Sequence, residues 1–93
     1  MHINVKILGT KSRQRYSVRR LVSWAETVLR EEYPDLEVNI QEGTTEEEIF
    51  KYTYVMISPG LVINEKLVYD IWIPSKEQVL GWMREAIEVV KIV

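Results

Sequence analysis

Hydrophobic and polar positions alternate in two short stretches of the chain, although the first ends on two apolar residues, Ile7 and Leu8. Residues 3–8 begin with Ile, Val and Ile separated by Asn and Lys, and residues 36–41 alternate Leu, Val and Ile with Glu, Asn and Gln. A period of two is typical of a strand that has one buried face and one wet face. The pattern therefore predicts two strands, each with a partly covered outer face, and Gly43 ends the second.

An apolar stripe with helical spacing lies between these predicted strands, after a polar and basic loop at residues 9–16. Its members are Val18, Leu21, Val22, Ala25, Val28 and Leu29. The spacing predicts an amphipathic helix, and Pro34 ends it near Tyr33. Ser12 and Ser17 are the two candidates for its N-cap, and the sequence does not choose between them.

The second half of the chain starts with a short predicted helix. Thr44 or Thr45 precedes three consecutive glutamates, and acidic side chains stabilise the first turn of a helix. The side chains expected on its buried side are Ile49, Phe50 and Tyr52.

A hairpin and a C-terminal helix follow. Residues 60–63 and 66–73 read as strands around Asn64-Glu65, a turn of two residues or a longer loop. Ser75 and Gln78 form a capping box, and the stripe behind it contains Val79, Met83, Ala86, Ile87 and Val90. The predicted order is β-α-β-α-β-β-α, which implies an α/β fold with a mixed four-stranded sheet and flanking helices.

Length and composition fit one globular domain that spans residues 1–93. Hydrophobic residues make up 46% of the chain and charged residues 28%. No apolar run approaches the roughly 20 residues of a membrane helix, and the N-terminus lacks the layout of a signal peptide. We therefore expect a cytoplasmic protein that does not enter a membrane.

Two residue counts exclude several kinds of chemistry. The chain contains no cysteine, which excludes disulfides, thiolate nucleophiles and zinc–thiolate or iron–sulfur sites. Its one histidine is His2, at a terminus that is a poor place to orient a catalytic imidazole. We expect no metal and no cofactor.

Charge is distributed unevenly along the chain. The first 20 residues contain six basic side chains and no acid, whereas the rest holds the other six bases and all 14 acids. Five of the early bases crowd the predicted start of the first helix: Lys11, Arg13, Arg15, Arg19 and Arg20. Free backbone N–H groups at a helix start already favour an anion, so added cations conflict with the helix dipole unless they bind something.

Three stretches carry a resemblance to a known family. Ile-Leu-Gly-Thr at 7–10 looks like a strand and turn that lead to a Cys-x-x-Cys. Residues 54–64, with Ser58-Pro59 before an apolar strand, look like a cis-proline stretch, and residues 68–77 look like a final strand and helix start. The chain thus resembles the small thioredoxin/glutaredoxin-like "redox-active disulfide" proteins, which implies a thioredoxin-like fold over nearly its whole length.

The sequence departs from that family at the Cys-x-x-Cys motif, which carries the family's redox chemistry. Its two cysteines would fall at Ser12 and Arg15, and neither a serine hydroxyl nor a guanidinium can replace a thiolate. We therefore expect no thiol–disulfide activity and no enzyme. What the resemblance implies instead is a shallow groove between a helix start and a proline loop, where family members pair with an extended peptide.

These observations predict a non-catalytic binding module that holds an acidic or extended protein or peptide partner. The candidate binding residues are Lys11, Ser12, Arg13, Arg15, Arg19, Arg20, Ser58 and Pro59. Three alternatives remain open: a role in redox homeostasis through a partner's cysteines, a sensor of small anions or nucleotides, and a basic loop left over from a lost redox site. The acidic remainder of the chain argues against nucleic acid.

Aromatic residues raise one question about assembly. Trp24 sits beside the first helical stripe and is expected in the core, whereas Trp72 is expected on the last strand, at a sheet edge. Edge strands invite pairing with another chain. A homodimer through Val68, Tyr69 and Trp72 is one alternative, and coverage of these side chains by helix packing is the other.

Overall fold

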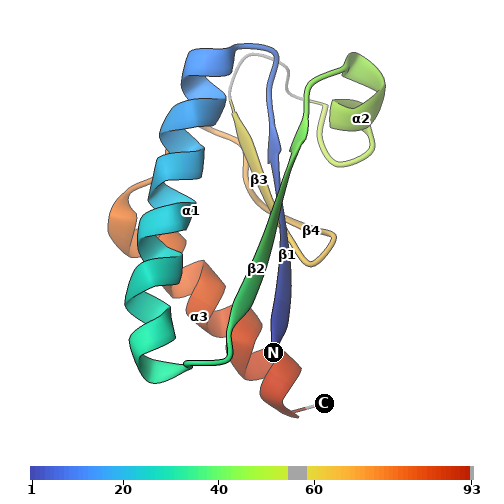
Figure 1. Ribbon diagram of the computed structural model, residues 1–93. Helices are drawn as coiled ribbons and strands as arrows, with labels where there is room; N and C mark the ends of the chain where they lie inside the picture. Colours follow the sequence, from blue (N-terminus) through green and yellow to red (C-terminus); the bar gives the residue numbers. More distant parts are fainter. Residues whose placement is uncertain (55–58, 93) are drawn as a thin grey trace.

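The computed structural model describes residues 1–54 and 59–92 and shows a mixed α/β fold (Figure 1). Four strands and three helices follow one another in the order β-α-β-α-β-β-α, as the sequence predicts. The elements are β1 (His2–Leu8), α1 (Ser12–Glu32), β2 (Glu37–Gly43), α2 (Glu46–Phe50), β3 (Gly60–Ile63), β4 (Lys66–Tyr69) and α3 (Lys76–Ile92).

The strands form one mixed sheet in the order β2-β1-β3-β4. β1 and β2 are parallel over seven residue pairs, whereas β3 is antiparallel to both β1 and β4. A crossover helix, α1, joins the parallel strands β1 and β2, and a tight turn joins the antiparallel strands β3 and β4. The end of β1, the beginning of α1 and the beginning of β3 therefore meet at one end of the molecule, opposite the two chain termini (Figure 1).

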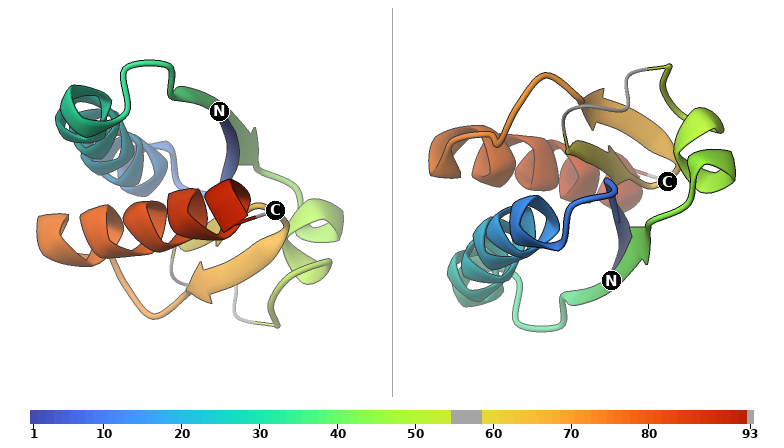
Figure 2. Two further views of the ribbon diagram at one scale, coloured as in Figure 1. Left: turned by 90° about the horizontal axis from the view of Figure 1, so that it is seen from below. Right: turned by 90° about the horizontal axis from the view of Figure 1, so that it is seen from above.

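The helices divide unequally between the two faces of the sheet. Seen along the molecule, α1 and α3 lie together on one face, while α2 lies on the other (Figure 2). The alternation of apolar and polar residues along β1 matches this arrangement, because Ile3, Val5 and Ile7 are buried beneath the two long helices. On the other face Asn4 is exposed and Lys6 is half-buried, which confirms the expected partly covered face.

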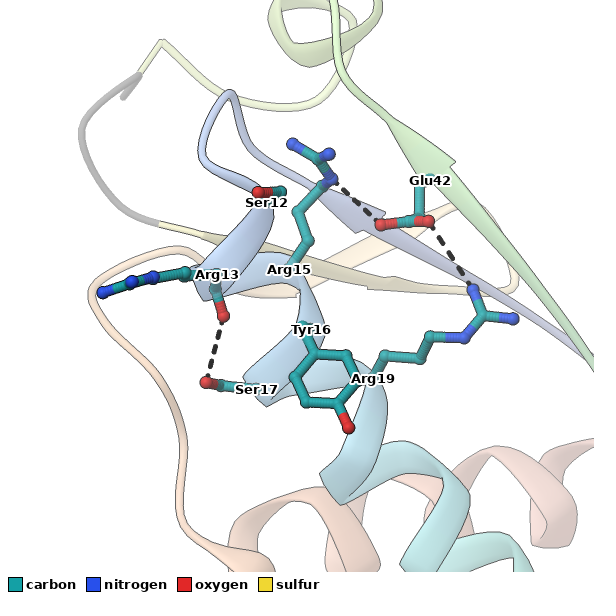
Figure 3. Close-up of a pocket in the computed structure, with 7 residues that line it drawn as sticks. All are labelled: Ser12, Arg13, Arg15, Tyr16, Ser17, Arg19 and Glu42. Carbon is teal, nitrogen blue, oxygen red and sulfur yellow. Dashed lines mark hydrogen bonds and ion pairs between the residues drawn. The ribbon is translucent and has the colours of Figure 1, made fainter.

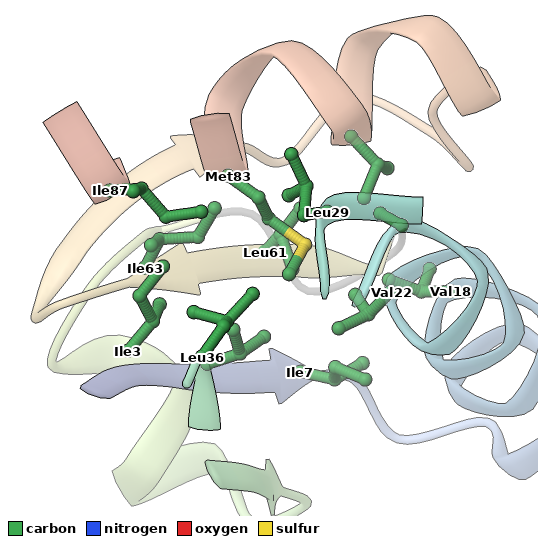
Figure 4. Packing of buried hydrophobic residues seen from close by; sticks show 13 residues of the cluster. Ile3, Ile7, Val18, Val22, Leu29, Leu36, Leu61, Ile63, Met83 and Ile87 are labelled. Carbon is green, nitrogen blue, oxygen red and sulfur yellow. The ribbon is translucent and has the colours of Figure 1, made fainter. Parts of the chain in front are cut away.

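The main core lies between the sheet and the two long helices (Figure 4). Met83 of α3 occupies its centre and is fully buried, close to Leu29 of α1 and Leu61 of β3.

A smaller cluster on the opposite face consists of Leu8, Ile49 and Val62, with Tyr52 and Leu67 packed against it. The short helix α2 thus buries Ile49 alone, while Phe50 is 46% exposed, so its expected burial is wrong. Ile49 and Phe50 are neighbours in the helix, so their side chains point about 100° apart and only that of Ile49 reaches the sheet.

Helix caps agree with the sequence at two of the three helices. Thr45 caps α2 by accepting a hydrogen bond from the Glu48 N–H, and Ser75 and Gln78 exchange the two bonds of a capping box at α3. The prediction for α1 is wrong: the N-cap is Lys11, without a side-chain bond, and Ser12 is the first helical residue. Ser17 lies a turn inside α1, where its hydroxyl donates to the Arg13 carbonyl.

The last strand is shorter than its apolar residues predict. β4 ends at Tyr69, because Asp70 leaves the ladder and accepts a hydrogen bond from the Thr53 hydroxyl. Trp72 therefore lies in the bend after the strand and is 54% exposed, so its placement on an edge strand is wrong. Asn64 and Glu65 make a two-residue turn with φ values of 50° and 68°, the conformation that a tight hairpin requires.

Polar contacts join the end of α1 to α3. Arg84 donates to the Glu32 carboxylate, and the Tyr33 hydroxyl donates to Glu88. The hydrogen bond from Arg84 lowers the pKa of Glu32, and the hydrogen bond to Glu88 raises the pKa of Tyr33. These contacts tie the two long helices together over their solvent-facing edges.

The Glu32–Arg84 pair makes stability depend on acidity with a definite sign. Because the folded-state pKa of Glu32 is below that of the unfolded chain, the pair stabilises the fold above the ordinary carboxyl pKa and loses this effect as the pH falls through the lowered value. Replacing Arg84 with glutamine should raise the pKa of Glu32 and reduce the amount by which the free energy of unfolding falls at acid pH. A carboxyl-detected NMR titration measures the pKa, and urea denaturation at several pH values measures the stability. An unchanged pKa for Glu32 in Arg84→Gln contradicts this assignment.

Candidate functional site

The first turns of α1 line a shallow, open groove at the end of the molecule where β1 finishes (Figure 3). Its lining comes almost entirely from α1, with one side chain from the end of β2: Ser12, Arg13, Arg15, Tyr16, Ser17, Arg19 and Glu42. The groove holds four of the candidate residues predicted from sequence. Lys11 and Arg20 lie on the same turns and are exposed.

Glu42 is the residue that sequence reasoning missed. It accepts a hydrogen bond from Arg15 Nε at 2.9 Å and lies 3.7 Å from Arg19 Nη1 (Figure 3). The parallel pairing of β2 with β1 places it there, because Glu42 is opposite Ile7 and shares the helix-covered face with Val38 and Ile40. The signal was available in principle, since parallel strands joined by a helix end at the same edge of a sheet.

Arg15 is held on two sides. Its Nη1 donates to the Gly9 carbonyl at 2.9 Å while its Nε bonds Glu42, and its side chain is only 15% exposed. A guanidinium that is fixed by two acceptors at known positions is a structural clamp. Arg15 therefore ties the loop after β1 to the end of β2.

Three other cations near the start of α1, Lys11, Arg13 and Arg20, are more accessible to a partner than Arg15. No hydrogen bond or ion pair joins the side chains of Lys11 or Arg13 to another residue within 1–54 and 59–92, and both are exposed. In Figure 3, Arg13 points away from the side of α1 that carries Arg15 and Arg19. Arg20 lies over the exposed ring of Tyr16, with its guanidinium carbon 5.9 Å from the ring centre.

Pro59 lies beside this helix start. A Cβ built on Gly9 would come within 3.8 Å of the Pro59 Cα and 3.5 Å of the Arg15 side chain, so Gly9 brings the loop after β1 against the start of β3. Pro59 itself is buried and is not among the residues that line the groove, so it offers no surface there. Ser58 and the Ser58–Pro59 peptide bond, predicted as a cis-proline site, lie outside the described residues.

A second depression continues along α1 on the far side of Tyr16 and Ser17. It is lined by Tyr16, Ser17, Arg20, Leu21, Trp24, Ile73, Pro74, Ser75 and Lys76. Lys76, at the start of α3, lies 5.2 Å above the ring of Trp24. Trp24, expected in the core, is half-buried and packs against the edge of the core. The basic side chains therefore continue from the start of α1 to the start of α3.

Neither a metal site nor a membrane helix emerges from the part of the chain that the structure describes. No cluster of three or more His, Asp or Glu side chains there has the arrangement to ligate a metal ion. None of its helices has both the length and the apolar character needed to cross a bilayer. Comparison with protein-family models, curated proteins and solved structures finds no match for the chain.

Gly9 supports the geometry of the site through its backbone. Its φ of 154° is a conformation that side chains with a Cβ rarely adopt, so Gly9→Ala should lower the free energy of unfolding by about 1–3 kcal/mol. Gly81 provides the matched control, because it lies exposed in α3 with nothing near its missing Cβ. Gly81→Ala should instead stabilise the protein by about 0.5–1 kcal/mol. Equal effects of the two substitutions in urea denaturation contradict this role of Gly9.

Proposed function

We propose that this chain is a redox-inert, non-catalytic binding module with a thioredoxin-like fold. Its groove at the start of α1 holds an acidic, extended segment of a protein or peptide partner. The element order and the mixed four-stranded sheet agree with the fold that the sequence resemblance implies. The binding surface consists of the exposed cations around the first turns of α1.

One observation carries the proposal: Lys11 and Arg13 are exposed, without a described ionic partner, at the positive end of a 21-residue helix. The first turn of α1 contains no acidic side chain that would balance this end of the helix dipole. Cations placed there repel the dipole in the free protein. A carboxylate bound at this position would relieve the repulsion and gain hydrogen bonds from the guanidinium.

The shape of the surface favours an extended segment over a compact ligand. The groove at Arg13 and Arg19 and the depression at Trp24 and Lys76 share Tyr16 and Ser17, so together they follow the side of α1. An extended peptide advances by about 3.3 Å per residue and can therefore place several side chains along such a surface. Cations at both ends of the path favour a segment with more than one acidic residue.

The state of Arg15 supports a role other than redox catalysis. The resemblance aligns this residue with the second cysteine of the Cys-x-x-Cys. Here Arg15 instead bonds Gly9 and Glu42 and is largely buried. The position therefore serves the structure of the groove, and without cysteine the chain cannot form a mixed disulfide with a partner.

Glu42 sets how strongly the groove attracts an anion. Its carboxylate offsets the charge of Arg15 and Arg19. Replacing Glu42 with glutamine removes this negative charge while it keeps an acceptor oxygen for Arg15, and should tighten the binding of an acidic peptide by about three- to tenfold at low salt. Glu37→Gln, at the other end of β2, removes the same charge far from the groove and provides the control. A fluorescence titration with labelled acidic peptide measures both variants.

The same titration tests the proposal as a whole. Affinity should rise with the number of Asp and Glu residues in the peptide and fall as salt is added, because exposed charges are screened. Inorganic phosphate and nucleotides tested as competitors separate a peptide site from a sensor of small anions. If acidic and neutral peptides bind equally, or if Glu37→Gln changes affinity as much as Glu42→Gln, the proposed site is wrong.

A further inference from the structure

The two edges of the sheet differ in how well they are protected against pairing with another strand. β4 has four residues, begins with Lys66, and carries an extra residue, Val68, between the pairs that Tyr69 and Leu67 make with β3. A short strand, an edge lysine and a bulge are devices that discourage pairing at a sheet edge. In addition, Tyr69 packs against Trp82 of α3, with ring centres 5.2 Å apart.

β2 has none of these devices. It runs for seven residues in unbroken register with β1 and contains no proline and no lysine. Its charged residues, Glu37 and Glu42, lie near its ends, and each already has a basic neighbour within the chain: His2 near Glu37, and Arg15 and Arg19 near Glu42. The middle of this edge, residues 38–41, is uncharged.

Backbone hydrogen bonds show which groups this edge presents. The Glu37 N–H donates to the Met1 carbonyl at 2.8 Å, and the Gly43 carbonyl accepts from the Gly9 N–H at 3.0 Å. In a parallel ladder alternate residues face the partner strand, so the odd-numbered residues of β2 face β1. Val38 and Ile40 therefore direct their N–H and C=O groups outward, at the free edge of the sheet.

We infer that a second copy of this chain pairs with β2, antiparallel and centred on Asn39. In this register Val38 lies opposite Ile40 of the second copy on the helix-covered face. Asn39 lies opposite Asn39, and Glu37 opposite Gln41, on the open face. Apolar side chains thus meet apolar ones, amides meet an amide or a carboxylate, and no like charges are opposed. The two sheets become one of eight strands.

Several features select this register. Val38 and Ile40 form the hydrogen-bonded pairs, so each copy satisfies its outward backbone groups with those of the other. Leu36 cannot extend the ladder, because its N–H donates to Tyr33 and its carbonyl accepts from Arg30. The half-buried side chains of Val38 and Ile40 also lose further exposure to water when they meet across the edge.

Absence of cysteine makes the register directly testable by cross-linking. Asn39 forms a non-hydrogen-bonded pair with its counterpart, with Cα atoms about 4.5 Å apart, a separation that a disulfide can span. Asn39→Cys should therefore give a covalent dimer on mild oxidation. Gln41→Cys is the matched control on the same strand and face, and its counterpart lies four residues along the edge, about 14 Å away, so it should stay uncross-linked.

Charge substitutions at the same two positions provide an independent measurement by sedimentation equilibrium of the full chain. Asn39→Lys opposes two lysines and should weaken dimerisation about threefold, whereas Gln41→Lys faces Glu37 in both copies and should strengthen it by a similar factor. A wild-type chain that stays monomeric up to millimolar concentration overturns the inference. So does a dimer in which the two cysteine variants cross-link equally or the two lysine variants change affinity in the same direction.

Discussion

Replacing Met83 with alanine should lower the free energy of unfolding by about 3 kcal/mol, the largest stability effect that we expect from a single side chain. Met83 is fully buried and lies between α1, α3 and the sheet (Figure 4). Truncation there leaves a cavity that Leu29 and Leu61 cannot fill without moving the helices. In a domain of 93 residues such a loss should lower the melting temperature by roughly 15 °C.

Met83→Leu separates this cavity effect from any special property of the thioether. Leucine has a similar volume, so this variant should lose less than about 1.5 kcal/mol. Urea denaturation followed by tryptophan fluorescence measures both variants, since Trp24 and Trp82 pack against the same core. If alanine costs no more than leucine, the two long helices do not pack on the sheet in the way the structure shows.

Reversing the two exposed cations at the start of α1 should have the largest effect on binding. In the double variant Lys11→Glu/Arg13→Glu, two attractive contacts with an acidic peptide become repulsive, and affinity should fall roughly thirtyfold at low salt. The fold itself should remain intact, because neither side chain is buried or joined to another described residue. New acids at the helix start should even improve its interaction with the dipole.

Lys66→Glu/Lys91→Glu is the matched control, since it changes net charge by the same amount on exposed residues away from the groove. It should weaken acidic-peptide binding only slightly, through long-range repulsion that salt removes. Calorimetric titration of both double variants, with circular dichroism to verify folding, separates a local site from a general charge effect. Similar losses in the two variants would falsify the placement of the site at α1.

Periodic patterns in the sequence predict most of the fold, because they depend on interactions between residues that are close together in the chain. The stripe from Val18 to Leu29 specifies α1, and alternation around Val5 specifies the half-covered sheet. The capping box at Ser75 likewise reads directly from sequence, because both of its partners lie within one helical turn. The end of β4 cannot be predicted in this way, because the hydrogen bond between Thr53 and Asp70 joins residues far apart in the chain.

The candidate site likewise has one part that the sequence predicts and one part that depends on tertiary structure. The cluster of cations at the start of α1 is visible as a run of bases in the sequence, and the structure places most of it in one groove. The division of that cluster into clamped and available members depends on Glu42, which only the parallel pairing of β2 with β1 brings close. Sequence therefore predicts where positive charge gathers, whereas tertiary structure decides which of those charges a partner can use.

An amide NMR titration of the isotopically labelled protein with an acidic peptide tests binding at the start of α1 most directly. We expect chemical-shift changes concentrated on residues 11–20 and on Gly9 and Gly60, which flank Pro59 in the structure. The changes should shrink as salt is added. Shifts confined to residues 66–73 or α3, or the absence of shifts at any peptide concentration, would contradict a binding site in this groove.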